Sequence, residues 1–158
     1  MTEPRGGRAG LRIARVADEA MLRDWQHVHN TIIPTDPLSL DQVRERAGRN
    51  RLEVAHLGDV LVGCSTVRPP AADRAAGDPA TATVIARVLP AHRRRGFGAV
   101  LYAQGLAAAR AAGAEVIETV VLASNPDGLR FALANGFVEV ETYLLPGHEV
   151  PYIDLRLA

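Results

Sequence analysis

The sequence has no lysine: its 18 basic residues are all arginines, and 18 acidic residues balance them to a formal net charge of zero. Proteins that bind nucleic acid or membrane surfaces normally carry a basic excess, so this balance argues against both kinds of partner. Cys64 is the single cysteine, which excludes an internal disulfide and a cysteine-based metal cluster, and we expect no bound metal. No apolar run is long enough to span a membrane, and no signal-peptide core is present near the N-terminus. We therefore expect a cytoplasmic protein.

The composition is that of an ordinary globular domain. Of the 158 residues, 47% are hydrophobic and 23% are charged, which is enough apolar material for one core. Residues 1–9 combine glycine, arginine and proline with little to bury, which is typical of a disordered leading segment. We therefore expect a single domain over residues 10–158.

Apolar periodicity divides this domain into strands and helices. Alternating or continuous apolar runs predict strands over residues 11–16, 51–57, 60–67, 81–89, 115–124, 137–145 and 151–158. Helical spacing, with Ser39 and Gln42 placed as a capping box, predicts helices over residues 18–28, 39–49, 98–112 and 125–135. The order β-α-α-β-β-β-α-β-α-β-β predicts an α/β fold in which helices pack on a mixed, largely antiparallel sheet.

The segment HRRRGFGAVL, residues 92–101, places three arginines and two glycines directly before a predicted helix. A dinucleotide-binding fingerprint needs a third glycine where Leu101 stands, and a P-loop needs a lysine, which the chain lacks. Free N–H groups at a helix start favour an anion, while Gly96 and Gly98 permit close approach of the backbone to a phosphate. The segment therefore predicts a phosphate-binding loop, and the alternative is an ordinary helix start with solvated arginines.

Two motifs around this segment resemble those of a known family. The stretch VLPAHRRRGFGAVLY, residues 88–102, is similar to the acyl-CoA pyrophosphate loop of the GNAT superfamily of N-acyltransferases, and the later stretch SNPDGLRFALANGF, residues 124–137, is similar to the second motif of that family. The residues that match are Val88, Pro90, Arg93, Gly96 and Gly98 in the first motif, and Asn125, Arg130, Phe131, Gly136 and Phe137 in the second. The spacing of the motifs and the order of elements from about Leu11 also match.

The resemblance implies a GNAT-like fold, with helices on both faces of the sheet and a gap between two neighbouring strands. Backbone groups near Ala86, Arg87 and Val88 would pair with the pantetheine arm of acetyl-CoA, and the N–H of Val88 would polarise the thioester carbonyl. The residues implied to hold the rest of the cofactor, mostly through backbone N–H groups, are Arg93, Arg94, Arg95, Gly96, Phe97, Gly98, Ala99 and Asn125.

The chain departs from the family pattern at Ala132, where members often carry a tyrosine that protonates the leaving thiolate. Tyr143 and Ser124 are the replacement acids nearest in type, and a thiolate with a pKa of about 8.5 can also leave with only water near it. Glu118, an acid within an apolar strand, is the candidate general base that takes a proton from the amine. His27 and His29 are alternative bases, although each is more typical of a surface or packing residue.

These residues predict an acetyltransferase that uses acetyl-CoA to acylate a primary amine of an unidentified small molecule or peptide. The alternative is a non-catalytic module that binds acyl-CoA and serves regulation or interaction, because the usual tyrosine is absent. A homodimer through the last strands is the expected assembly by analogy with relatives that pair two such domains.

Overall fold

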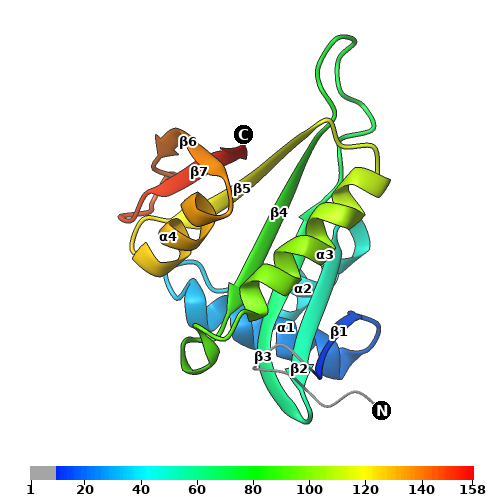
Figure 1. Ribbon diagram of the computed structural model, residues 1–158, viewed down its shortest axis with the longest axis vertical. Coiled ribbons are helices and arrows are strands. Elements are labelled where there is room, and N and C mark those ends of the chain that lie inside the picture. The colour runs from blue at the N-terminus through cyan, green and yellow to red at the C-terminus, as the bar shows by residue number, and fades with distance from the viewer. Residues whose placement is uncertain (1–9) are drawn as a thin grey trace.

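Residues 10–158, the part of the chain that the computed structural model describes, form seven strands and four α-helices in the predicted order (Figure 1). The expectation of a disordered lead over residues 1–9 lies outside the described residues. In chain order the elements are β1 (Leu11–Arg15), α1 (Glu19–Ile32), α2 (Leu40–Arg49), β2 (Arg51–Leu57), β3 (Val60–Arg68), β4 (Thr81–Val88), the short 3-10 helix η2 (Pro90–His92), α3 (Phe97–Ala111), β5 (Val116–Leu122), α4 (Pro126–Ala134), β6 (Phe137–Tyr143) and β7 (Tyr152–Leu157).

The strands form one sheet in the order β1-β2-β3-β4-β5-β7-β6. Every neighbouring pair is antiparallel except β4 and β5, which are parallel because α3 carries the chain between them. The prediction of a mixed and largely antiparallel sheet is therefore confirmed. None of the described helices has both the length and the apolar character that crossing a membrane requires.

Helix ends follow the polar residues that cap them. Ser39 and Gln42 make both hydrogen bonds of the predicted capping box at the start of α2. The predicted end of the first helix near Val28 was wrong, since α1 continues to Ile32. The intervening residues contain no helix breaker, and the first one is Pro34. This extra turn matters because it brings the end of α1 beside the functional site.

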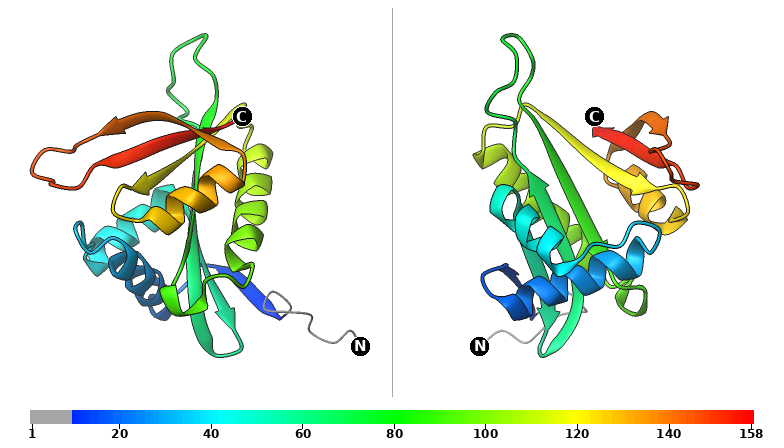
Figure 2. Two further views of the ribbon diagram at one scale, coloured as in Figure 1. Left: turned by 60° about the vertical axis from the view of Figure 1, so that its left-hand side comes forward. Right: turned by 180° about the vertical axis from the view of Figure 1, so that it is seen from behind.

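Helices cover both faces of the sheet, as predicted (Figure 2). Helices α1 and α2 lie on one face, where Trp25, Val43 and Cys64 belong to one buried cluster. Helices α3 and α4 lie on the opposite face, where Tyr102 and Phe137 belong to another. Trp25 and Cys64 are core residues, with exposed fractions of 1% and 0%.

Strands β4 and β5 diverge in the middle of the sheet. They pair only from Thr81 with Val116 to Thr83 with Glu118, and Figures 1 and 2 show them separating beyond that point. Each strand keeps its outer partner: β4 stays paired with β3 as far as Val88, and β5 is paired with β7 from Glu118 to Leu122. The sheet therefore contains an internal V-shaped gap whose two sides are each held in place from outside.

Candidate active site

The backbone of β4 presents N–H groups to this gap. On the side away from the gap, the N–H of Leu89 donates to the carbonyl of Val62 on β3 at 2.9 Å. Because N–H groups alternate between the two sides of a strand, those of Ala86 and Val88 point into the gap. A polar extended chain lying there can pair with them as an added strand would.

The loop between β4 and α3 has the backbone shape of an anion site. Arg94 has a φ of 66° and Gly96 a φ of 82°, both in the left-handed region. Gly96 is the N-cap of α3, and no side chain caps the free N–H groups that follow it. Such N–H groups and the positive end of the helix dipole favour a phosphate. A left-handed arginine stores strain, which is typical of functional loops.

The side chains of the loop arginines have separate tasks. Arg93 holds the loop to its surroundings: its Nε donates to the carbonyl of Val88 at 2.9 Å, and its Nη1 contacts Asp127 at 3.3 Å. Arg95 lies over the ring of Phe97, 5.0 Å from the centroid, and Phe97 itself is buried in the core. Arg94 is exposed and is the loop arginine whose side chain has no such attachment.

The two glycines of the loop differ from each other. Gly96 serves the backbone conformation just described. The expectation that Gly98 permits backbone approach to a phosphate stays a prediction; in addition, a Cβ at Gly98 would lie 2.9 Å from the Phe131 ring. The second glycine of the motif therefore lets α3 pack closely against α4.

A cavity of about 630 Å³ adjoins the loop and the gap. Among the predicted cofactor residues, Arg95 and Ala99 do not line this cavity. Those that line it are Ala86, Arg87, Val88, Arg93, Arg94, Gly96, Phe97, Gly98 and Asn125. Asn125 is the N-cap of α4, and its Oδ1 accepts a hydrogen bond from the N–H of Gly128 at 3.1 Å. The two sequence motifs thus meet around one cavity.

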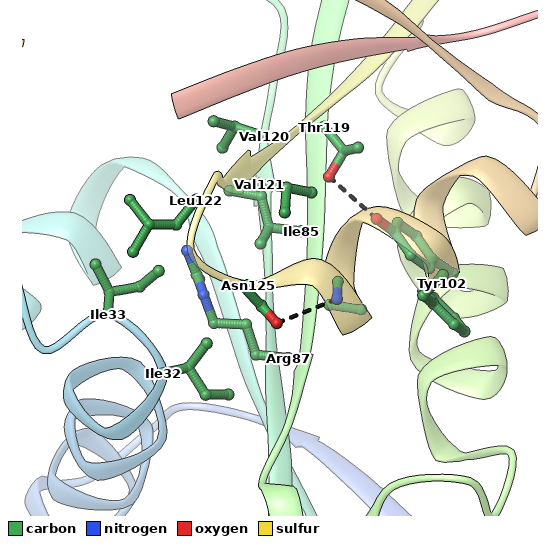
Figure 3. Close-up of a pocket in the computed structure, with 13 residues that line it drawn as sticks. Ile32, Ile33, Ile85, Arg87, Tyr102, Thr119, Val120, Val121, Leu122 and Asn125 are labelled. Carbon is green, nitrogen blue, oxygen red and sulfur yellow. Dashed lines mark hydrogen bonds between the residues drawn. The ribbon is translucent and has the colours of Figure 1, made fainter. Parts of the chain in front are cut away.

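A second cavity, of about 40 Å³, lies where β4 and β5 diverge (Figure 3). It shares Ala86, Arg87, Asn125 and Phe131 with the larger cavity, so the two are contiguous. Its walls come from β4, β5, α3, α4 and the end of α1, and most of its side chains are apolar. This size suits a group of a few atoms.

Tyr102 and His92 are polar lining residues that sequence reasoning did not assign to the site. Tyr102 lines the smaller cavity, with its hydroxyl 3.1 Å from Thr119 Oγ1, and burial raises the pKa of this tyrosine. His92 lines the larger cavity, and its Nδ1 is buried with no hydrogen-bond partner among residues 10–158. Helical spacing marks Tyr102 as a buried position, but nothing in the sequence shows that it faces a cavity.

Of the predicted catalytic residues and the alternative acid Ser124, Val88 lines the larger cavity, whereas Glu118, Tyr143 and Ser124 line neither cavity. Glu118 occupies the last paired position before the gap and forms an ion pair with Arg156 at 3.0 Å. The hydroxyl of Tyr143 donates to Asp154 at 3.1 Å, and burial together with the Asp154 charge raises the pKa of Tyr143 to about 12. Val88 does face the gap, through its N–H. Ser124 is exposed and lines neither cavity.

Ala132 and the two histidines of α1 have structural roles. Ala132 has an exposed fraction of 0% and belongs to the core beneath α4. His29 is buried and stacks on Trp25, with ring centroids 5.3 Å apart. Burial, followed by the charge of Arg87, lowers the pKa of His29 to about 4. His27 is exposed, and neither histidine lines the cavities.

Known structures share this arrangement of elements. The chain superposes on yncA of Salmonella typhimurium, solved with its cofactor acetyl-CoA, with a TM-score of 0.72 and 18% identity, covering 94% of this chain and 93% of that one. An N-acetyltransferase from Staphylococcus aureus Mu50 superposes with a TM-score of 0.69 and 17% identity, covering 93% of this chain and 97% of that one. A ribosomal-protein-alanine N-acetyltransferase from Brucella melitensis superposes with a TM-score of 0.69 and 20% identity, covering 92% of this chain and 98% of that one. At such identities the likeness is one of fold.

The sequence itself gives the family. No curated protein matches the chain. The family model described as acetyltransferase (GNAT) family matches residues 17–137, which include the gap, the loop and both motifs. The chain therefore belongs to the GNAT family of acetyltransferases, which transfer an acetyl group from acetyl-CoA.

Proposed function

We propose that the protein transfers the acetyl group of acetyl-CoA to a primary amine of a small molecule or peptide, by direct attack while both substrates are bound. The observation that carries this proposal is the gap between β4 and β5 with the left-handed loop at its end. The amine nitrogen bonds to the acetyl carbon as the carbon–sulfur bond breaks. The thiolate leaves with the electron pair, and a base of the protein takes the amine proton.

The chain offers a matching group for each part of acetyl-CoA. The N–H groups of Ala86 and Val88 would hold the pantetheine arm, and the N–H groups from Arg93 to Ala99 would hold the pyrophosphate. When bound, the cofactor supplies an activated acyl carbonyl.

The N–H of Val88 is suited to stabilise negative charge on the acyl oxygen. It points into the gap, and β3 holds Val88 rigidly on the other side. A fixed donor aimed at a developing charge costs no reorganisation during reaction. The small volume of the cavity at the divergence of the strands favours an acetyl group over a long acyl chain.

Glu118 stays our candidate general base. It lies at the end of the paired part of β5, and Arg156 keeps its carboxylate oriented. Replacing it, as Glu118→Gln, is expected to lower kcat about tenfold with little change in acetyl-CoA affinity, and to remove the acid limb of the pH–rate profile. Glu139→Gln, an exposed carboxylate on β6, is the matched control. An unchanged pH profile in Glu118→Gln would show that Glu118 is only a partner of Arg156.

Two tyrosines are candidates for protonating the leaving thiolate. Tyr102 is better placed than Tyr143, because its hydroxyl lies at the smaller cavity and its raised pKa keeps it protonated. Tyr143 is already engaged with Asp154. Comparing Tyr102→Phe with Tyr143→Phe in the rate of thiol release separates the two: the variant with the larger loss of kcat identifies the acid.

The proposal is tested by binding and turnover measured together. Calorimetry should show acetyl-CoA and CoA binding at micromolar affinity and ATP binding much more weakly. A panel of amines with thiol release as readout should then identify an acceptor. Equal affinity for ATP and CoA would refute the pantetheine part of the proposal. Firm acetyl-CoA binding with no turnover across the panel would favour a non-catalytic acyl-CoA-binding module.

We also propose a homodimer through the C-terminal strands. Strand β6 is the outermost strand on its side of the sheet, and it exposes half of both Val138 and Val140. Leu144 and Leu145 continue this apolar surface beyond the strand, with exposed fractions of 57% and 38%. Light scattering of the protein and of a Val138→Glu, Val140→Lys double variant tests the assembly: the variant should be monomeric.

A further inference from the structure

Arg87 carries a charge that the acetyl-CoA site does not use. On β4 it alternates with Ala86 and Val88, which pack toward α3, so its side chain lies on the opposite face, under α1. Figure 3 shows this side chain extending between Ile32 and Ile33 at the end of α1 and Leu122 at the end of β5. It lines both cavities, at the place where they join.

The charge of Arg87 has no carboxylate partner. Among residues 10–158 no carboxylate oxygen lies within 4 Å of its guanidinium, whereas Arg93 and Arg156 each have one. Cys64 on β3 is the strand partner of Arg87. Burial raises the pKa of the Cys64 thiol to about 12, so this thiol stays neutral. A partly buried cation without a counterion is unfavourable, so this site favours an anion.

The groups that surround Arg87 add positive charge. Arg68 is on the same face of the sheet, and Arg46 approaches from α2; neither forms an ion pair within the described part of the chain. Both lower the pKa of Arg87, after burial, which has the largest effect. Arg87 and Arg46 also help burial to depress the pKa of His29.

The acids near this face are not partners of Arg87. The hydroxyl of Tyr143 donates to Asp154. Burial, and next the negative charge of Asp36, raise the pKa of Tyr152. Neither Asp36 nor Asp154 forms an ion pair with an arginine in residues 10–158. The face between α1, α2 and the gap therefore carries the three arginines Arg46, Arg68 and Arg87 against these two acids, and we call it the cationic face.

We propose that the acceptor carries a carboxylate next to its amine, as an amino acid or similar small amino-carboxylate does, and that Arg87 binds this carboxylate. The proposal rests on the proposed function. The guanidinium fork of arginine matches the two oxygens of a carboxylate. Arg87 lines both cavities, and Val88, whose N–H would face the acyl oxygen, is the next residue along β4, so we place the carboxylate close to the attacking amine.

The test uses matched acceptors that differ only in the carboxylate. Two sets are leucine, leucinamide and isoamylamine, and phenylalanine, phenylalaninamide and phenethylamine; the same comparison extends to the other amino acids. In the wild type the best amino acid should exceed its amide in kcat/KM by at least about tenfold, the discrimination expected of one charged hydrogen-bonded pair. Arg87→Gln should reduce that preference to about twofold by raising KM, and Arg87→Lys should retain part of it. Arg110→Gln, on the exposed side of α3, is the matched control.

A binding measurement makes the test independent of turnover. With CoA present, N-acetyl amino acids should bind the wild type by calorimetry more tightly than their amides, and Arg87→Gln should lose the difference. If CoA itself does not bind, the proposed function fails. If CoA binds but amides are accepted or bound as well as amino acids, or no amino-carboxylate binds, the function stands and the carboxylate proposal is overturned. The comparison within the wild type decides this even if Arg87→Gln does not fold.

Discussion

The loop between β4 and α3 and the sheet face that carries Arg87 are both rich in arginine, yet they use it in opposite ways. In the loop, Arg93 and Arg95 are attached to the protein, and the backbone with its left-handed residues presents the N–H groups. On the face, the backbone is paired in the sheet and the guanidinium of Arg87 is the free group. A count of arginines thus says little about where charge is available, and contacts decide it.

Gly96→Val should disrupt the backbone conformation of the loop between β4 and α3 without changing the face that carries Arg87. A β-branched residue at a φ of 82° is strained, and we expect acetyl-CoA affinity to fall several hundred-fold, roughly 3 to 4 kcal/mol. Calorimetry measures the loss. Gly77→Val is the matched control, since Gly77 has a φ of 91° in an exposed loop with open space around it. If both variants bind acetyl-CoA normally, the conformation of the loop is not what holds the phosphates.

Acidification should destabilise the protein through His29, whose pKa is lowered mainly by burial and next by the charge of Arg87. Its pKa is lowered from 6.5 to about 4, so the unfolded chain binds the proton more readily and stability falls as the pH drops through that interval. The full shift corresponds to roughly 3 kcal/mol of unfolding free energy. Urea unfolding at pH 7.5 and pH 4.5 should show a smaller loss for His29→Gln than for the wild type. An equal loss in both proteins would mean that His29 does not titrate in this interval.

Ala132→Tyr asks whether the active site lacks a catalytic hydroxyl at the position where family members often have one. Ala132 is fully buried, so a tyrosine there should overpack the core and lower the unfolding free energy by about 2 kcal/mol, without raising turnover. Leu133→Tyr, at the next and half-exposed residue, should change stability little. Higher turnover in Ala132→Tyr at unchanged stability would show that the site does lack this group.

Arg94→Ala should have the smallest effect. The side chain is exposed, and losing one solvated contact to a phosphate should weaken acetyl-CoA binding about fivefold, near 1 kcal/mol. Arg94→Gly removes the same side chain but also relieves the positive φ of 66°, so it should bind at least as well as Arg94→Ala. A greater loss in Arg94→Ala than in Gly96→Val would reverse the comparison, making side chains the phosphate holders.

The loop could be predicted from the sequence and the cationic face could not, for a physical reason. The loop is one continuous segment whose glycine spacing reflects its backbone, and the strands and caps around it follow from local periodicity. The cationic face is assembled from Arg46 on α2, Arg68 on β3 and Arg87 on β4, which come together only when the strands pair and α2 packs on the sheet. The close approach of Gly98 to Phe131 was missed likewise, because Phe131 is on another helix.

The divergence of β4 from β5 also bears on how the protein behaves when no ligand is bound. Residues 84–88 of β4 then form a strand edge inside the sheet, with N–H groups that another polypeptide can pair with. The run TVIARVL has the β-branched, apolar character of aggregation-prone segments, and Arg87 is the charged residue that interrupts it. CoA that fills the gap should therefore protect the purified protein from aggregation.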